Sequence, residues 1–303
     1  MNTRTTLLLS LALAAIAAPA LAQDVDGTLK KIRDNGSITL GIRESSYPLS
    51  YLDDRQQPVG YHIDVCKHIV DAVKARLKLP ALKVQHQAVT SQNRIPLVSN
   101  GTVDLECGST TNNEARQKQV AFAPTTFVTN VRMAVKKASG IMSLGQLNGK
   151  PVATTTGTTS VQLMRAHEKG KNIDFREVYG KDHADAFLML ETDRAVAFVM
   201  DDNLLAGLIV SSKAPADYAI VGEVLNVEPI GIMLRKEDPA FKKLVDETVI
   251  GLMKSGELDK FYTRWFLSPI PPKNANLNFP MSEALKKLIK APGDAPAEAF
   301  NRK

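Results

Sequence analysis

The sequence predicts an α/β protein of two domains. From residue 35 onward, segments typical of strands alternate with segments typical of helices, and a second alternating series begins near residue 132. The chain has 303 residues, whereas one core typically serves about 100–150 residues. The alternation and the length together favour two domains over one.

The first series contains three predicted strands, at residues 37–43, 81–89 and 102–107. Residues 44–60, between the first strand and the first helix, are expected to be irregular. Residues 64–79 are expected to form a helix, because an apolar side chain recurs every four residues on one face: Val65, Ile69, Val73 and Leu77. With two more short helices in the segment described below, the order is β-α-β-α-β-α, which indicates a sheet with helices on both faces.

The second series repeats the pattern in which a strand ends and a helix begins. Residues 151–156 predict a strand that leads through Gly157 and hydroxyl residues into a helix. A predicted strand at residues 173–178 precedes a helix with Asp182 as its expected N-cap. The apolar strand at residues 195–202 then ends in two aspartates.

The last part of the chain returns to helix. Residues 218–225 and 229–236 are predicted to be extended, and residues 239–266 are predicted to be helical with an apolar face. An amphipathic helix is expected at residues 282–290. The polar tail after it, residues 291–303, is expected to be disordered.

Two arginines, Arg94 and Arg116, lie in one segment, residues 89–122, where strand ends and helix starts follow one another. Thr111 and Glu114 have the spacing of a capping box, which predicts a helix start at Thr111. Helix N-termini present unpaired N–H groups to anions. A guanidinium one turn into such a helix can bind a carboxylate or phosphate with two parallel hydrogen bonds. The segment therefore indicates anion binding more clearly than catalysis.

The first 22 residues have the features of a secretory signal. Arg4 is followed by an apolar run at residues 7–18 and by a small-residue cleavage site at residues 20–22. The apolar run is too short to span a membrane, which takes about 20 residues. We therefore expect residues 1–22 to be removed and the mature chain to be soluble and exported.

The composition argues against several classes of function. The formal net charge of +6 is spread along the chain without a basic run, which argues against nucleic-acid binding. Cys66 and Cys107 suggest a disulfide in an exported protein, although two buried free thiols are a competing interpretation. Neither the cysteines nor the five histidines have the spacing of metal ligands. We expect neither a metal nor a cofactor.

The order of these motifs resembles that of the periplasmic amino-acid-binding proteins of ABC transporters, and more narrowly their glutamate/aspartate-binding subfamily. The resemblance covers about residues 29–278 and rests on several blocks: RESSYPLSYLD, TSQNRIPL, ECGSTTNNEARQKQ, KDH, RAVAF and SPIPPKN. It implies the type II periplasmic-binding-protein fold, two α/β lobes joined by two strands. The implied first lobe is residues 23–131 plus 231–303, and the second is residues 132–230.

The resemblance also implies nine ligand-binding residues: Arg43, Ser91, Arg94, Ser109, Thr111, Arg116, Thr159, His183 and Asp201. Arg116, with Ser109 and Thr111 beside it, would bind the α-carboxylate of an amino acid. The backbone N–H of Thr159 would reach the same carboxylate from the opposite lobe. Asp201 would pair with the ammonium group, and the neighbouring aspartate is its competitor, since strand alternation directs the two to opposite faces.

Arg43 and Arg94 would bind the side-chain carboxylate of the ligand, with Ser91 and His183 completing that pocket. A neutral ligand would leave two buried guanidinium groups unpaired, which favours acidic amino acids. For Tyr47 two interpretations stay open, stacking on the ligand and a position at the rim. The preference between glutamate and aspartate also stays open, because one methylene contributes only about 1 kcal/mol.

The leading hypothesis is a monomeric periplasmic receptor that binds L-glutamate or L-aspartate and delivers it to the membrane permease of an ABC transporter, without chemistry. A second hypothesis is an enzyme on the same fold, such as a dehydratase of a carboxylated substrate, for which His183 is the candidate acid or base. A third is a sensory protein that presents ligand to a membrane receptor. Neighbouring genes for a permease or a sensor kinase would discriminate the first from the third.

Overall fold

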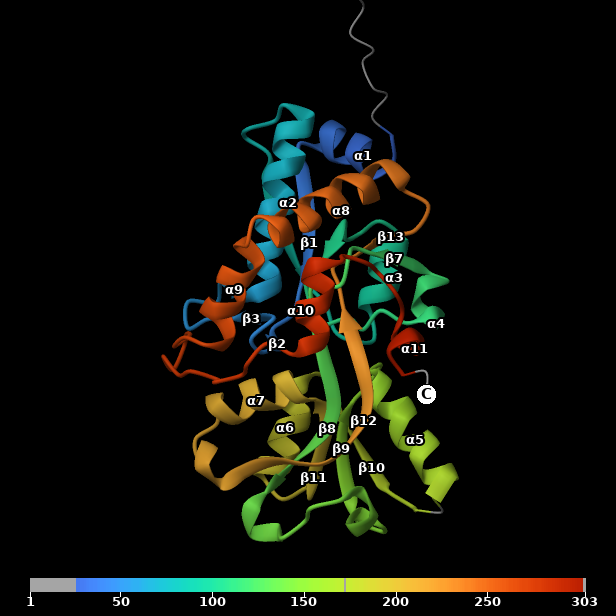
Figure 1. The fold of residues 1–303 in the computed structure, drawn as a ribbon, viewed down its shortest axis with the longest axis vertical. Helices are drawn as coiled ribbons and strands as arrows, with labels where there is room; N and C mark the ends of the chain where they lie inside the picture. Colours follow the sequence, from blue (N-terminus) through green and yellow to red (C-terminus); the bar gives the residue numbers. More distant parts are fainter. Residues whose placement is uncertain (1–25, 172, 302–303) are drawn as a thin grey trace, which may run out of the picture.

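The computed structural model describes residues 26–171 and 173–301, so the predicted signal at residues 1–22 lies outside the described residues. Two five-stranded sheets, each covered by helices, form two lobes of an elongated molecule (Figure 1). The strand order is β5-β1-β6-β13-β7 in the first sheet and β10-β9-β11-β8-β12 in the second. The predicted architecture of two α/β lobes is confirmed.

The first lobe is built on a mixed sheet, in which β1 runs parallel to β5 and β6 while β13 is antiparallel to its neighbours. Its strands are β1 (Ser37–Ile42), β5 (Lys83–Ala88), β6 (Leu105–Glu106), β7 (Val120–Phe122) and β13 (Met233–Arg235). Its helices are α1 (Gly27–Asn35), α2 (Tyr61–Leu77), α3 (Arg94–Ser99), α4 (Glu114–Gln117), α8 (Pro239–Lys254), α9 (Glu257–Phe266), α10 (Glu283–Lys290) and α11 (Ala297–Phe300).

The second lobe is built on the strands β8 (Phe127–Lys136), β9 (Pro151–Thr155), β10 (Arg176–Gly180), β11 (Ala197–Asp201) and β12 (Tyr218–Ile230). Its α-helices are α5 (Thr159–Lys171), α6 (His183–Glu191) and α7 (Asp202–Ser211), and short 3-10 helices occur at Lys137–Ser139, Leu144–Leu147 and Pro215–Asp217. The long antiparallel strands β8 and β12 run from this sheet up to the first lobe (Figure 1). They are the two strands that join the lobes, whereas the exact residue boundaries of each lobe stay a prediction.

The segment predicted to be irregular holds a small antiparallel sheet of β2 (Ser45–Ser46), β3 (Ser50–Leu52) and β4 (Pro58–Val59). That prediction was wrong because strands of two or three residues are too short to show an alternating pattern. Helix α1 was not predicted either. It ends at Gly36, whose φ of +61° is the left-handed conformation that glycine adopts at helix ends.

The predicted capping box at Thr111 and Glu114 is also wrong. The N-cap of α4 is Asn113, whose side chain accepts a hydrogen bond from the backbone N–H of Arg116. Thr111 instead forms an isolated β-bridge with Ile230. An asparagine next to the helix is an equally good cap, and the bridge to β12 holds Thr111 in extended backbone outside the helix.

The tail predicted to be disordered is ordered up to Asn301. The Gly293 carbonyl accepts from the Thr125 N–H at 2.8 Å, and the Ala297 N–H donates to the Asn112 carbonyl at 2.9 Å. The Asn301 amide accepts from the N–H of Val227 and donates to its carbonyl, which attaches α11 to the strand β12. The tail is held mainly by polar contacts to backbone, which its composition does not reveal.

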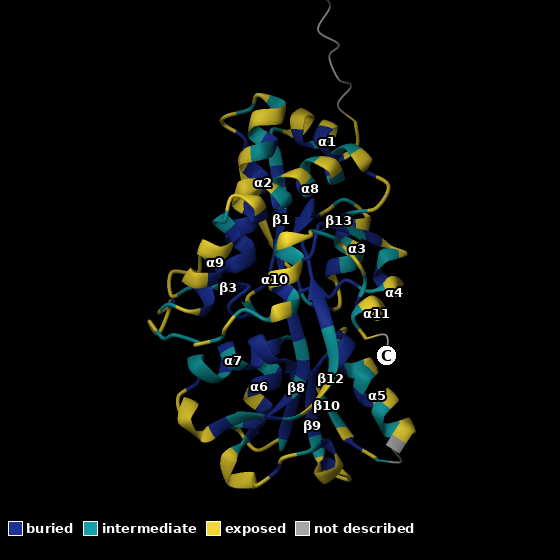
Figure 2. Cartoon of the chain, in the orientation of Figure 1, coloured by how far each residue is buried: buried dark blue, intermediate teal, exposed yellow. Residues whose placement is uncertain are grey.

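The cores of both lobes lie between sheet and helices, with the central strands largely buried, the edge strand β5 exposed and the outer helix faces exposed (Figure 2). Cys66 on α2 and Cys107 after β6 form a disulfide, which settles the alternatives left open for these cysteines. The disulfide joins the helix layer to the strand end that precedes Ser109. One predicted ligand-binding residue is therefore two positions from a covalent link.

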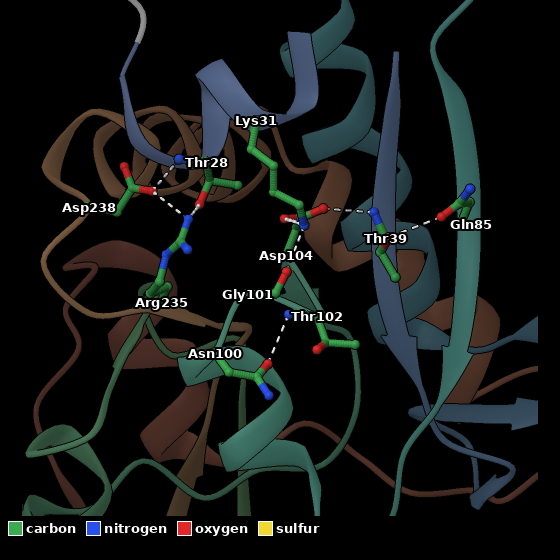
Figure 3. A network of polar contacts seen from close by, with 10 residues as sticks. All are labelled: Thr28, Lys31, Thr39, Gln85, Asn100, Gly101, Thr102, Asp104, Arg235 and Asp238. Atoms are coloured by element: carbon green, nitrogen blue, oxygen red, sulfur yellow. Dashed lines mark hydrogen bonds and ion pairs between the residues drawn. The ribbon is translucent and has the colours of Figure 1, made fainter. Parts of the chain in front are cut away.

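Polar contacts attach α1 to the first sheet at the end that lies away from the second lobe (Figure 3). Lys31 donates to Asp104 at 2.8 Å, and Asp104 accepts from the backbone N–H of Thr39 at 2.9 Å. Arg235 on β13 donates to the Thr28 hydroxyl at 2.6 Å. These contacts lie toward the N-terminal ends of the parallel strands β1 and β6 and at the carboxyl end of the antiparallel β13, so the carboxyl ends of β1 and β6 face the second lobe.

Candidate functional site

The nine predicted ligand-binding residues come together between the lobes, at the carboxyl ends of strands from both sheets. Arg43 follows β1, Ser109 follows β6, and Asp201 ends β11. Ligands of open α/β sheets bind at such ends. A small cavity lies there, lined by Ser91, Arg94, Ser109, Thr111, Thr158, Thr159, His183, Met200 and Asp201. Seven of the nine predicted residues line it, and Arg43 and Arg116 contact lining residues.

Arg43 is 1% exposed and donates to the hydroxyl of Ser109 at 3.2 Å and to that of Ser91 at 3.1 Å. Burial, with the neighbouring charge of Arg94, lowers the pKa of Arg43 to about 9. The guanidinium is therefore charged at neutral pH, and it holds two hydroxyl groups at the wall of the cavity.

Arg94 begins α3 and is 2% exposed. Its Nε and Nη1 atoms make no hydrogen bond to any residue that the structure describes. Burial lowers the pKa of this guanidinium, while the charges of Glu106 and Asp201 oppose the shift. A buried charged donor without an acceptor is costly. An anion in the cavity beside Arg94 would remove that cost.

Arg116 projects from α4 and donates to the Thr111 carbonyl at 2.8 Å and, more weakly, to the Gly157 carbonyl at 3.5 Å. The second contact reaches the loop between β9 and α5, so this arginine bridges the lobes. Burial, with the charge of Arg94, lowers the pKa of Arg116 to about 10. The group is charged at neutral pH.

His183 is the first residue of α6, and Asp182 caps that helix as predicted. Its Nε2 lies 3.3 Å from a guanidinium nitrogen of Arg43, and its Nδ1 lies 2.9 Å from the Thr155 hydroxyl. Because a guanidinium only donates, Nε2 is the acceptor and the proton is on Nδ1. Burial, with the charges of Arg43 and Arg94, holds the pKa of His183 well below its ordinary value. The ring is neutral and both of its nitrogens are engaged.

The structure separates the two aspartates at the end of β11. Asp201 is 4% exposed and lines the cavity. Asp202 accepts from the Thr129 hydroxyl at 2.8 Å and from the Asn130 side chain at 2.9 Å. Burial, followed by the charges of Glu228 and Asp202, raises the pKa of Asp201 well above its ordinary value. Asp201 is thus the aspartate placed to receive a cation.

Two buried carboxylates of the site were missed from the sequence. Glu106 on β6 accepts from the Thr110 hydroxyl at 2.7 Å, and Glu228 on β12 accepts from the hydroxyls of Thr111 and Thr159 at 2.6 and 2.8 Å. A charged residue inside the apolar segment 102–107 was a usable signal for Glu106. Glu228 had no comparable signal, because its role depends on the contact between distant segments.

The lobes touch closely at two glycines. A Cβ atom on Gly157, whose φ is +81°, would lie 2.8 Å from the backbone of Gln92. A Cβ atom on Gly207 would lie 2.6 Å from the Tyr47 carbonyl oxygen. Tyr47 packs on Tyr51 with ring centroids 3.8 Å apart and donates to the Pro271 carbonyl. It does not line the cavity, which agrees with the rim interpretation.

No arrangement of three or more His, Cys, Asp or Glu side chains within residues 26–171 and 173–301 could hold a metal ion. Among the helices of this described part, none is both long and apolar enough to cross a membrane.

Two α/β lobes joined by two strands, with a small charged cavity between them, define a binding protein that encloses its ligand. Residues 38–268 match the bacterial extracellular solute-binding proteins, family 3, and the chain belongs to this family. Its fold is that of the type II periplasmic binding proteins.

The chain is similar to the L-glutamate/L-aspartate-binding protein of Pseudomonas aeruginosa, with 51% identity over 294 residues, 96% of this chain and 97% of that protein. It is also similar to the glutamate/aspartate import solute-binding protein of Escherichia coli K12, with 48% identity over 291 residues, 95% and 96% of the two chains.

Two solved structures share the fold. One is an ancestral arginine-binding protein bound to glutamine, with a TM-score of 0.68 and 27% identity over 76% of this chain and 98% of that chain. The other is an ancestral amino acid-binding protein described as a precursor of cyclohexadienyl dehydratase, with a TM-score of 0.68 and 26% identity over 79% and 99% of the two chains.

Proposed function

We propose that this protein is a periplasmic solute-binding protein that captures L-glutamate or L-aspartate between its lobes and delivers it to the membrane permease of an ABC transporter. The observation that carries the proposal is that buried side chains of opposite charge line one cavity. Arg94 has two buried guanidinium nitrogens without an acceptor among the described residues, and Asp201 places a buried carboxylate, whose pKa is raised by burial, at the same cavity. An amino acid with a second carboxylate satisfies both.

The groups common to all amino acids are assigned to Arg116 and Asp201. Arg116 would hold the α-carboxylate together with the backbone N–H of Thr159, which begins α5 in the other lobe. Asp201 would hold the ammonium group. Because these residues come from both lobes, the closed arrangement supplies more partners than the open one, and ligand binding favours closure.

The second carboxylate is assigned to Arg43 and Arg94, with Ser91 and Ser109 at the same wall. His183 would act through Arg43, because its Nε2 accepts from that guanidinium. A neutral side chain in this position leaves buried positive charge unpaired. The pocket therefore rejects glutamine and asparagine more strongly than it attracts the acids.

The competing enzyme hypothesis is less well supported. The relatives described above are named as binding proteins, and His183 has both ring nitrogens engaged. A general base needs a free acceptor within reach of the substrate proton. We propose binding and release without turnover, so product formed from bound glutamate would overturn this part. A sensory role is compatible with transport, and adjacent permease genes would support the transport role.

The location and assembly belong to the same proposal. Residues 1–22 would be removed on export, and the mature protein would act as a monomer in the periplasm. N-terminal sequencing of periplasmic protein would detect a start near Gln23.

The direct test of the ligand is isothermal titration with glutamate, aspartate, glutamine and asparagine. We expect at least one acidic amino acid to bind with a Kd below about 10 μM, which corresponds to about −7 kcal/mol. The neutral amides should bind far more weakly. Tighter binding of an amide, or of a basic amino acid, than of either acid would overturn the proposal.

A further inference from the structure

Glu228 is a fully buried carboxylate on the connecting strand β12, with 0% of its surface exposed. Its Oε2 accepts from the Thr111 hydroxyl at 2.6 Å and from the Thr159 hydroxyl at 2.8 Å. Its Oε1 accepts from the Asn226 amide at 3.1 Å. One carboxylate thus binds hydroxyls of both lobes, since Thr111 precedes α4 and Thr159 begins α5.

These two hydrogen bonds determine what the threonines can offer to a ligand. A hydroxyl has one proton to donate, and an ionised carboxylate only accepts. The protons of Thr111 and Thr159 are therefore directed at Glu228. Both threonines line the cavity, so their remaining lone pairs are available there as hydrogen-bond acceptors. The pair suits a donor such as an ammonium group and does not suit a carboxylate.

The neighbouring charged residues are also arranged to suit an ammonium group beside these hydroxyls. The buried carboxylate of Asp201 lines the same cavity. Arg116 donates to the backbone carbonyl of Thr111, so the expected carboxylate site adjoins the threonine. The ammonium and carboxylate of an amino acid share one carbon atom, and their subsites must lie side by side. The surroundings of Glu228 meet that requirement.

We propose that Glu228 is a positioning residue that orients the hydroxyls of Thr111 and Thr159 as acceptors for the ligand ammonium, so that the site selects amino acids over dicarboxylates without an amine. This inference rests on the proposed function, because it refines how an amino acid is bound. It also couples ammonium recognition to closure, since the two threonines reach Glu228 together when the lobes meet.

Titration calorimetry with L-glutamate and with glutarate tests the inference. Glutarate has both carboxylates of glutamate but no ammonium group. The ratio of the two affinities would be measured for wild type, Glu228→Met, Glu228→Gln, Thr111→Val and Thr159→Val. Glu223→Met, which changes an exposed glutamate of the same strand, is the matched control.

We expect Glu228→Met to lower the glutamate-to-glutarate ratio by about tenfold or more, because a charged donor loses oriented acceptors. Glu228→Gln, whose carbonyl can still accept from the hydroxyls, should lose less. The threonine variants should lower the ratio with Glu228 intact, which also covers the case that Glu228→Met does not fold. The double variant Thr111→Val, Glu228→Gln should lose less than the sum of its single changes, if Glu228 acts through Thr111.

Equal losses for glutamate and glutarate in Glu228→Met and both threonine variants would overturn the inference, because a purely structural role affects both ligands alike. Unchanged affinities for both ligands in these variants would also overturn it. In both cases wild type still binds glutamate, so the proposed function survives. Failure of wild type to bind either acidic amino acid would overturn the proposed function and this inference together.

Discussion

Gly207 on α7 of the second lobe lies against Tyr47 of the first, so close that a Cβ atom would be 2.6 Å from the Tyr47 carbonyl oxygen. Glycine inside a helix is about 1 kcal/mol less favourable than alanine. The close approach of the two lobes therefore best explains why residue 207 is a glycine. The contact joins the two lobes.

The variant Gly207→Ala should hinder closure without weakening the second lobe. We expect glutamate affinity to fall by about tenfold or more, because the closed state loses more than about 1.4 kcal/mol. The melting temperature of the unliganded protein should stay the same or rise. Small-angle scattering should show a smaller contraction on adding glutamate than in wild type.

Gly251→Ala is the matched control for this variant. Gly251 lies in α8, and a Cβ atom there meets no atom within 4 Å. The control should stabilise the helix and leave the affinity unchanged. Normal closure and affinity in Gly207→Ala would show that the lobes tolerate this side chain, against our account of the contact.

The disulfide between Cys66 and Cys107 closes a loop with a sequence separation of 41. Constraining a loop of that length in the unfolded chain stabilises the fold by about 4 kcal/mol in the chain-entropy model. The double variant Cys66→Ser, Cys107→Ser should have a free energy of unfolding lower by this order of magnitude. Urea unfolding should show this as a lower midpoint. Addition of a thiol reductant should shift wild type in the same direction and leave the variant unaffected. A midpoint equal to that of oxidised wild type would contradict the prediction.

His62 is buried between the Gly108 carbonyl and the Thr126 hydroxyl, and burial lowers its pKa to about 4. The unfolded chain, with an ordinary pKa of about 6.5, binds the proton first. Stability is therefore full above about pH 6.5 and declines as the pH falls toward the folded value of about 4, by up to about 3 kcal/mol. The neutral histidine His183 contributes in the same direction.

Urea unfolding at a series of pH values measures this decline. In His62→Gln the decline between about pH 6.5 and pH 4.5 should be shallower than in wild type. His68→Gln changes an exposed histidine of the same helix and serves as the control. Equal slopes for wild type and His62→Gln would rule out this contribution.

The raised pKa of Asp201 makes ligand binding compete with a proton. An ammonium group at Asp201 favours the ionised carboxylate, so the pKa is lower in the complex than in the free closed protein. Affinity is therefore full above the raised pKa and falls as the pH decreases through it. Titrations at a series of decreasing pH values should show this loss beginning above the range of the ligand's own side chain at about 4.3.

Asp201→Asn should bind glutamate more weakly at every pH and lack the acid loss. A wild-type affinity that falls no earlier than the titration of the ligand's own side chain would contradict the assigned partner of the ammonium group.

The sequence predicted most of what depends on local pattern. Arg43 and Asp201 end apolar strands, and Asp182 has the position of a helix cap, so their placement follows from strand and helix signals. Local pattern also singled out Arg94 and Arg116 as an anion site, whereas the resemblance to known binding proteins supplied the ligand roles of all nine predicted residues. Its contribution was largest for Ser91 and His183, whose local patterns are unremarkable.

Features that depend on distant contacts could not be predicted. Glu228 lies on a strand without any distinctive pattern, and its partners Thr111 and Thr159 are 117 and 69 residues away. Asn301 is ordered by the backbone of Val227, which no property of the tail indicates. Hydrogen bonds of this kind follow from the tertiary arrangement rather than from local sequence.

The central claim is that Arg94 recognises the second carboxylate of the ligand, and Arg94→Ala tests it most directly. Removing one partner of a buried charge pair typically costs about 2–5 kcal/mol, or roughly 30-fold to several thousand-fold in affinity. Titration should show that loss for glutamate and a much smaller loss for glutamine, while Arg176→Ala, an exposed arginine on β10, changes neither. Equal losses for glutamate and glutamine in Arg94→Ala would contradict the account.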